Sequence, residues 1–165
     1  MAMLGWTSWK ERRRLLALLR PDVRSLAAGL LGGVAMLGIN WLMSRWISSE
    51  PATISVIKAM PPFLTGALAA VLAPVAEESW FRGRLLEIIE NGTGRRLAVV
   101  VTSALFALVH LGGGLDQLPW LAVYFVFGLV LAGLRLKTGG LAAGIVAHAI
   151  NNAAALVSIY SSLGY

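Results

Sequence analysis

Five long stretches without a charged residue constrain the fold of this chain more than any other feature. They cover 25–44, 59–76, 97–115, 117–134 and 138–165, and together they hold 103 of the 165 residues. About 20 apolar residues suffice for a helix to cross a bilayer. The apolar/polar alternation at period two that is typical of a membrane β-barrel is missing from the sequence. The pattern therefore predicts an all-α, polytopic membrane protein with about five transmembrane helices.

The composition excludes two other classes of protein. Hydrophobic residues make up 58% of the chain and charged residues 13%, and the mean hydropathy is +0.75. Soluble domains average about 45–50% apolar and about 25% charged residues, and disordered chains are more polar still. The absence of cysteine from the sequence excludes disulfides, thiolate metal ligands and a cysteine nucleophile.

The basic residues are distributed unevenly between the two sides of the predicted spans. Twelve of the 14 Lys and Arg residues precede the first span or lie between the second and third or the fourth and fifth, and only Arg45 and Lys58 fall on the other side. The positive-inside rule then places the N-terminus in the cytoplasm and the C-terminus outside. The net charge of +6 is thus a topology signal, and we expect no nucleic-acid partner. Residues 1–24 are predicted to form a basic interfacial helix, and 25–165 the transmembrane core.

Prolines and glycines mark the helix boundaries. Pro61-Pro62 suit the start of a helix that keeps its spacing to Glu90, while 91–94 and 139–140 read as turns. Pro74 lies inside this helix, three residues before Glu77. It is either a tolerated proline or the cause of a kink that opens space beside the carboxylate.

Ionisable and amide side chains inside membrane spans are costly and indicate function by default. Six such residues lie within or at the end of the apolar stretches: Glu77, Glu78, His110, His148, Asn151 and Asn152. Helical spacing aims a carboxylate, an imidazole, and an imidazole with a carboxamide from three helices toward one cavity. A purely structural polar network is the alternative.

These residues fall into three motifs that resemble those of the CPBP family, the CAAX-protease and bacteriocin-processing group of intramembrane proteases. In chain order they are Glu77-Glu78-x-x-x-Arg82, Phe106-x-x-x-His110 and His148-x-x-x-Asn152. The resemblance extends over about 59–159. It implies a multi-pass protein of the cytoplasmic membrane of a prokaryote and an endopeptidase acting on a membrane-associated, prenylated or otherwise hydrophobic peptide.

The resemblance also implies roles for the site residues. Glu77 is expected to be the general base that activates a water together with His110, while His148 and Asn152 are expected to stabilise the oxyanion. Glu78, Arg82 and Phe106 are expected to support these groups, since Glu78 has Arg82 one turn further on.

Zinc is the alternative to metal-free catalysis. Glu77, His110 and His148 match a His₂Glu ligand set, but the compact H-E-x-x-H motif is absent from the sequence. Glu78 would then have to serve as the base, although the spacing commits it to Arg82. The metal-free mechanism is therefore favoured, and the family's metalloprotease-like character stays open.

The depths of these residues in their spans raise a geometric difficulty. Counted from Arg96 and Lys137, His110 and His148 lie about 21 Å and about 16 Å deep, whereas Glu77 is shallower. The three side chains meet only if the helices tilt or if a polar cavity thins the membrane.

Two other functions remain as alternatives: a non-catalytic membrane adaptor or immunity-type protein, and a small proton-coupled carrier. The intact motifs disfavour the first, and the lack of visible inverted repeats disfavours the second. The expected partners are membrane lipids and a hydrophobic or lipid-modified peptide, with a homo-oligomer left open.

Overall fold

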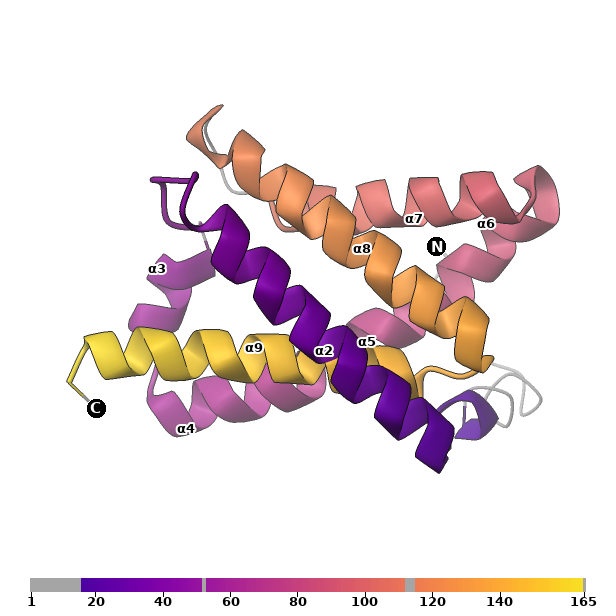
Figure 1. Ribbon diagram of the computed structural model, residues 1–165, viewed down its shortest axis with the longest axis horizontal. Helices are drawn as coiled ribbons and strands as arrows, with labels where there is room; N and C mark the ends of the chain where they lie inside the picture. The colour runs from indigo at the N-terminus through magenta and orange to yellow at the C-terminus, as the bar shows by residue number, and fades with distance from the viewer. Residues whose placement is uncertain (1–15, 52, 112–114, 165) are drawn as a thin grey trace, which may run out of the picture.

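The computed structural model describes residues 16–51, 53–111 and 115–164, and all regular secondary structure within these residues is helical (Figure 1). The all-α prediction is therefore confirmed. Most of the predicted interfacial segment 1–24 lies outside the described residues.

Three helices are long and apolar enough to cross a membrane: α2 (Val23–Met43), α8 (Leu118–Thr138) and α9 (Ala142–Ser162), each of 21 residues. Their ends follow the local sequence. Asp22 caps α2 by accepting the Ser25 N–H at 2.6 Å, and this hydrogen bond lowers the pKa of the Asp22 carboxyl below its usual 3.8. The turn predicted at 139–140 is confirmed, because Gly139 ends α8 with a left-handed φ of 75°.

The second predicted span is one continuous helical run that changes its hydrogen-bond pattern along its length. The run consists of α4 (Pro62–Thr65), the π-helical η1 (Gly66–Leu72), α5 (Ala73–Glu78), the π-helical η2 (Ser79–Leu85) and α6 (Leu86–Thr93). The prediction of a continuous helix from Pro61 to Glu90 is confirmed, apart from its π-helical stretches. The turn predicted at 91–94 is wrong, because the helix continues to Thr93 and only Gly94, with φ of 84°, interrupts it.

The third predicted span, 97–115, is shorter than expected. Helix α7 (Arg95–Val109) has 15 residues, and the N–H of the next residue, His110, bonds the Ala107 carbonyl oxygen three residues back at 3.0 Å. Two short helices, α3 (Thr53–Lys58) and η3 (Leu115–Gln117), lie in the connecting segments. Three helices rather than five therefore satisfy the length and composition of a membrane span within the described residues.

Among the three long helices, α2 and α8 follow nearly the same direction, and α9 crosses them (Figure 1). Helix α2 packs across α9 and alongside α8, and α7 packs against α8. Close approach of α2 to α9 requires glycine at Gly29, where an added Cβ would lie 2.8 Å from the carbonyl oxygen of Ala143. The packing of these helices brings Glu77, His110 and His148 close to one another.

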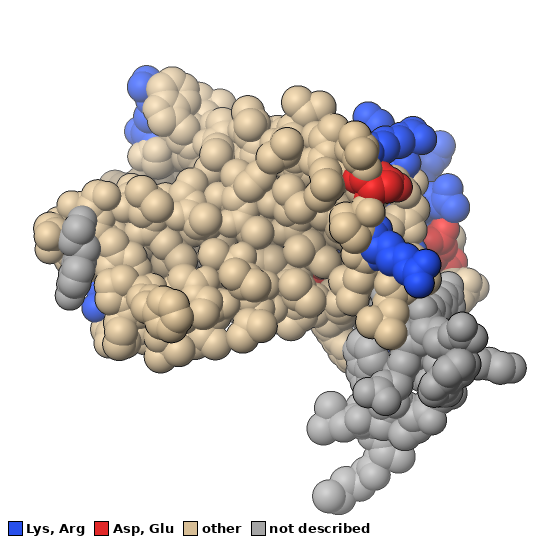
Figure 2. Space-filling view, turned by 90° about the horizontal axis from the view of Figure 1, so that it is seen from below, with Lys and Arg blue, Asp and Glu red and all other residues tan. Residues whose placement is uncertain are grey.

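Most of the charged side chains drawn in Figure 2 lie at one end of the molecule, and a few basic ones lie at the other. The more highly charged end, on the right in both views, holds the start of α7 and the end of α8 with Arg95, Arg135 and Lys137. The middle of the face drawn in Figure 2 is almost free of charge. The arrangement is consistent with a protein that spans a membrane.

Candidate active site

Glu77 and Glu78 lie on the last turn of α5, a short α-helical segment between two π-helical stretches. Pro74 explains part of this change in pattern. A proline within a helix supplies no N–H to the carbonyl four residues earlier, and its ring collides with that carbonyl. The π-helical stretch η1 ends two residues before Pro74, at Leu72, and local π adjustment is one way in which membrane helices accommodate proline.

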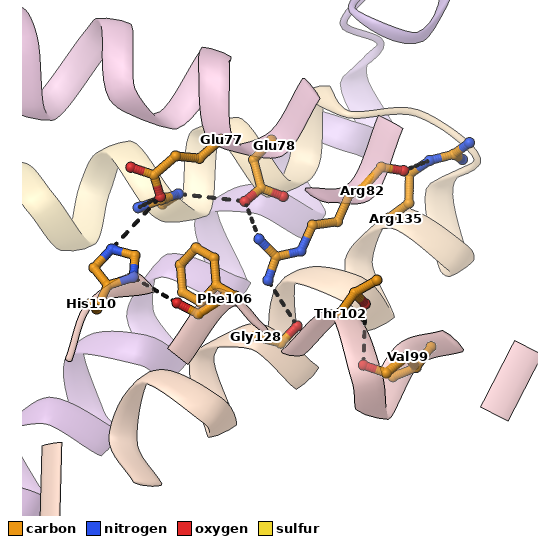
Figure 3. Close-up of polar contacts among 10 residues, drawn as sticks. Glu77, Glu78, Arg82, Val99, Thr102, Phe106, His110, Gly128 and Arg135 are labelled. Atoms are coloured by element: carbon orange, nitrogen blue, oxygen red, sulfur yellow. Dashed lines mark hydrogen bonds and ion pairs between the residues drawn. The ribbon is translucent and has the colours of Figure 1, made fainter. Parts of the chain in front are cut away.

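Glu78 and Arg82 form a fully buried ion pair, with Oε1 to Nη1 at 2.9 Å (Figure 3). Arg82 Nη2 also donates to the carbonyl oxygen of Gly128 at 3.2 Å, and its guanidinium lies 4.3 Å above the ring of Phe106. The pairing expected from the four-residue spacing is thus present. It fixes Glu78 in the interior and leaves Glu77, 28% exposed, to face the cavity.

His110 is held in one orientation from two sides. Its Nδ1 lies 2.7 Å from the carbonyl oxygen of Phe106 and must carry the proton, because a carbonyl can only accept. The ring of Tyr124 stacks on the imidazole with centroids 4.6 Å apart. In the neutral imidazole Nε2 is then an acceptor, and it lies 3.7 Å from Glu77 Oε2.

His148, on α9, faces both carboxylates. Its Nε2 lies 3.9 Å from Glu77 Oε2, and its Nδ1 lies 3.5 Å from Glu78 Oε1. The edge of the Phe106 ring packs against it, with centroids 5.8 Å apart. The predicted meeting of Glu77, His110 and His148 is therefore present, because the crossing of the helices offsets their different depths in the chain.

Asn152 lies one turn after His148, as predicted, but its amide already has a partner. Its Nδ2 donates to the carbonyl oxygen of Ala69 in η1 at 2.9 Å, and its Oδ1 accepts from Asn151 Nδ2 at 3.4 Å. One of its two amide hydrogens thus bonds Ala69, and the other has no partner among the residues that the structure describes.

A cavity of about 800 Å³ connects these polar groups to an apolar surface. Glu77, His110 and His148 line it together with Asn151 and Asn152. Its other walls are largely apolar and come from α2, α3, α8 and the end of α9, among them Met36, Trp41, Ile54, Met60, Val123, Phe127 and Ile159. A cavity of this shape suits a largely hydrophobic ligand with one polar group to be placed at the carboxylates.

The proposed zinc ligands do not form a metal site by their geometry. Within residues 16–51, 53–111 and 115–164, no group of three or more His, Cys, Asp or Glu side chains is arranged to hold a metal ion. Both histidines approach the same carboxylate oxygen, Glu77 Oε2, at 3.7 and 3.9 Å.

Three contributors to the site were not predicted from the sequence. Tyr124 stacks on His110, Gly128 supplies a carbonyl to Arg82, and Arg135 Nε donates to the carbonyl oxygen of Arg82 at 3.3 Å. Tyr124 carries a recognisable signal, because it is a hydroxyl-bearing residue within the apolar stretch 117–134. The carbonyl contacts depend on backbone geometry and leave no pattern of residue types.

The fold and the site together define a helical membrane protein with a glutamate–histidine centre in its interior. The sequence profile of the type II CAAX prenyl endopeptidase Rce1-like family matches residues 59–154, and the chain belongs to this family of CAAX-type intramembrane proteases. The expected CPBP resemblance is thereby confirmed.

Individual relatives are more distant. The UPF0177 protein YxdF of Lactococcus lactis is 28% identical over 102 residues, which cover 62% of this chain and 55% of that protein. An uncharacterized 24.3 kDa protein of Escherichia coli is 31% identical over 139 residues, which cover 72% of this chain and 63% of that protein. The chain therefore spans between about half and two thirds of the length of these curated relatives. No solved structure matches it significantly.

Proposed function

We propose that this chain is an intramembrane endopeptidase that hydrolyses a peptide bond with a water molecule activated by Glu77 and His110. The observation that carries the proposal is the position of Glu77 Oε2. This buried atom has no hydrogen-bond partner among the described residues and lies 3.7 Å from His110 Nε2. A separation of 3.7 Å is too long for a direct hydrogen bond, whereas a water can bridge two acceptors at this distance.

The attack begins at this water. Glu77 takes a proton from it, and His110 holds its oxygen in line because the bond from Nδ1 to the Phe106 carbonyl leaves Nε2 as the acceptor. The oxygen then attacks the scissile carbonyl carbon, and the carbonyl oxygen becomes an oxyanion. A positioned general base typically contributes about 10²–10⁴-fold to the rate.

The oxyanion is stabilised by donors on α9. The imidazole of His148, which lines the cavity, and the second amide hydrogen of Asn152 serve as these donors. Each oxyanion donor is worth about 3–4 kcal/mol in known enzymes. The proton held by Glu77 then passes to the departing amine as the C–N bond breaks, which restores the carboxylate.

The cavity supports a membrane-associated substrate. Its apolar walls suit a hydrophobic or lipid-modified peptide, and the proposed location is the cytoplasmic membrane of a prokaryote with the N-terminus inside. The collection of charged residues at one end of the molecule supports this orientation (Figure 2).

A cleavage assay with matched glutamate variants tests the proposal. The purified protein in detergent micelles is incubated with a library of internally quenched hydrophobic peptides, including peptides with a farnesylated cysteine near the C-terminus. Glu77→Gln is compared with Glu90→Gln, because Glu90 lies on the same helical run and its side chain is 30% exposed, close to the 28% of Glu77. We expect Glu77→Gln to abolish cleavage and Glu90→Gln to preserve it. Equal cleavage by Glu77→Gln and the native chain, or no cleavage by the native chain, would contradict the proposal.

A further inference from the structure

The segment that carries Glu77 and Glu78 lies between two changes of hydrogen-bond pattern. A π-helix bonds each N–H to the carbonyl five residues earlier, whereas an α-helix uses the carbonyl four residues earlier. Where the five-residue pattern returns to the four-residue pattern, one carbonyl oxygen is passed over, which means that no backbone N–H of the helix bonds it. Such a carbonyl needs a donor from elsewhere when it is buried.

At the end of η1 the carbonyl that is passed over belongs to Ala69. The Ala73 N–H, which would bond Ala69 in an α-helix, donates to Leu68 instead. The next donor in the five-residue pattern would be residue 74, and Pro74 has no N–H. The Ala69 carbonyl oxygen accepts from Asn152 Nδ2 at 2.9 Å, across 83 residues of sequence.

The same arrangement recurs at the end of η2, on the other side of the two glutamates. The Leu86 N–H donates to the carbonyl oxygen of Phe81 rather than to that of Arg82. The Arg82 carbonyl oxygen accepts from the side-chain Nε of Arg135 on α8 at 3.3 Å (Figure 3). Two side chains from the C-terminal half of the chain thus bond the two passed-over carbonyls.

We infer that Asn152 and Arg135 are positioning residues that lock the π-helical stretches on either side of α5 and thereby fix the direction of Glu77. Without these hydrogen bonds, the segment that carries Glu77 would turn through a large angle. Each residue of an α-helix turns the chain by about 100°, so that a change of pattern by one residue would rotate the following segment away from His110 and His148. The role of Asn152 is additional to donation from its second amide hydrogen. Of the measurements that test this inference, only peptide cleavage rests on the proposed function.

The variant Pro74→Ala provides a background in which the positioning role of Asn152 can be tested. Alanine at position 74 supplies the missing N–H, which can bond the Ala69 carbonyl oxygen in the five-residue pattern. Alternatively, the helix can adopt the four-residue pattern, in which the N–H of Ala73 bonds the Ala69 carbonyl oxygen. Asn152 is then no longer the sole donor. The loss caused by Asn152→Ala is therefore smaller in Pro74→Ala than in the native chain.

The first measurement is a double-mutant cycle on thermal stability in detergent micelles. In the native background, Asn152→Ala removes the donor to the partly buried carbonyl of Ala69, and we expect the Tm to fall by about 2–6 °C. In the Pro74→Ala background we expect less than half of that fall. Asn91→Ala is the matched control, because it removes an amide from an exposed position. An equal fall in both backgrounds would overturn the inference.

The second measurement reports the position of Glu77 directly. The chain has only two histidines, His110 and His148, so that ¹⁵N-histidine labelling gives imidazole resonances from the site alone. We expect Arg135→Gln to shift these resonances at fixed pH, because Glu77 would move relative to both rings. The control Lys137→Gln removes an exposed charge from the same turn of α8 and should leave them in place. Unchanged resonances in Arg135→Gln would overturn the role of Arg135.

Cleavage of the quenched peptides adds a third measurement. Because Asn152→Ala displaces Glu77, kcat falls more than KM rises, and part of the kcat is restored in the double variant with Pro74→Ala. An equal loss of kcat in both backgrounds would contradict a positioning role. If the native chain cleaves nothing, the proposed function fails, while the stability cycle and the resonances still decide the inference.

Discussion

Replacement of Glu77 or Glu78 by glutamine distinguishes the general base from the structural carboxylate. The two residues are adjacent and chemically identical, but their surroundings differ. Glu78 is fully buried against Arg82 at 2.9 Å, whereas Glu77 is 28% exposed in the cavity and makes only the longer approaches to His110 and His148. One substitution should therefore affect mainly stability and the other mainly catalysis.

The magnitudes follow from these contacts. Removal of one partner from a buried ion pair costs about 3–5 kcal/mol. Glutamine keeps one acceptor oxygen for Arg82, so we take about 3 kcal/mol for Glu78→Gln. At about 2–4 °C per kcal/mol for a chain of this size, the Tm falls by about 6–12 °C. Glu77→Gln breaks no short hydrogen bond, and we expect its Tm to change by less than about 4 °C while kcat falls by about 10²–10⁴-fold.

The six tryptophans of the chain allow both variants to be followed by intrinsic fluorescence during heating in micelles. Turnover of a quenched hydrophobic peptide is measured on the same samples below the lower Tm. We expect Glu78→Gln to retain more turnover than Glu77→Gln, although its contact with His148 at 3.5 Å is altered. A stable, inactive Glu78→Gln beside an active Glu77→Gln would show that the base has been assigned to the wrong carboxylate.

Four further predictions can be checked independently. In the cysteine-free chain, Ser49→Cys should react with an impermeant thiol reagent from outside the cell and Thr93→Cys only from inside, and the opposite labelling would reverse the topology. Exhaustive chelation should leave peptide cleavage intact without stoichiometric zinc, whereas recovery of lost activity with one equivalent of metal would contradict metal-free catalysis. Gly144→Ala should lower the Tm by about 2–10 °C, because its Cβ would lie 2.7 Å from the buried Glu78 Oε2, and an unchanged Tm would contradict the tight packing. The Ser25 N–H lowers the pKa of Asp22 below 3.8, so the stability that Asp22 adds is present above this pH and is lost as the pH falls through the lowered pKa. The Tm difference between the native chain and Asp22→Ala should shrink accordingly, and a difference independent of pH would contradict the role of the charge.

The helical run and the meeting of the polar residues could be predicted from the sequence because they depend on residue types and their order. Pro61-Pro62 at the start and unbroken helical spacing to Glu90 were sufficient to predict one continuous helix, which the structure has from Pro62 to Thr93. The ionisable groups of the apolar stretches need polar partners in an apolar interior, and this favoured the meeting of Glu77, His110 and His148. Their unequal depths argued against this only for parallel, upright helices, whereas α9 crosses α2 and α8 (Figure 1).

The hydrogen-bond pattern inside that helix could not be predicted in the same way. A π-helical and an α-helical turn accept the same apolar residues, and they differ in which carbonyl each N–H reaches. The four-residue spacing correctly predicted that Glu78 bonds Arg82, because side chains one turn apart share a face of the helix. It carried no information on the carbonyl oxygens of Ala69 and Arg82.

The hydrogen-bond partner of Asn152 bears on what Pro74 does to the helix. A proline merely tolerated in the helix would leave Asn152 free to serve the substrate alone, and a proline that changes the pattern creates an acceptor that has to be satisfied. The 2.9 Å bond from Asn152 Nδ2 to Ala69 supports a proline that changes the hydrogen-bond pattern; the kink that would open space beside Glu77 stays a prediction. A motif of the form His148-x-x-x-Asn152 fixes which face of α9 the amide occupies, and the backbone opposite that face decides how many of its hydrogens remain for catalysis.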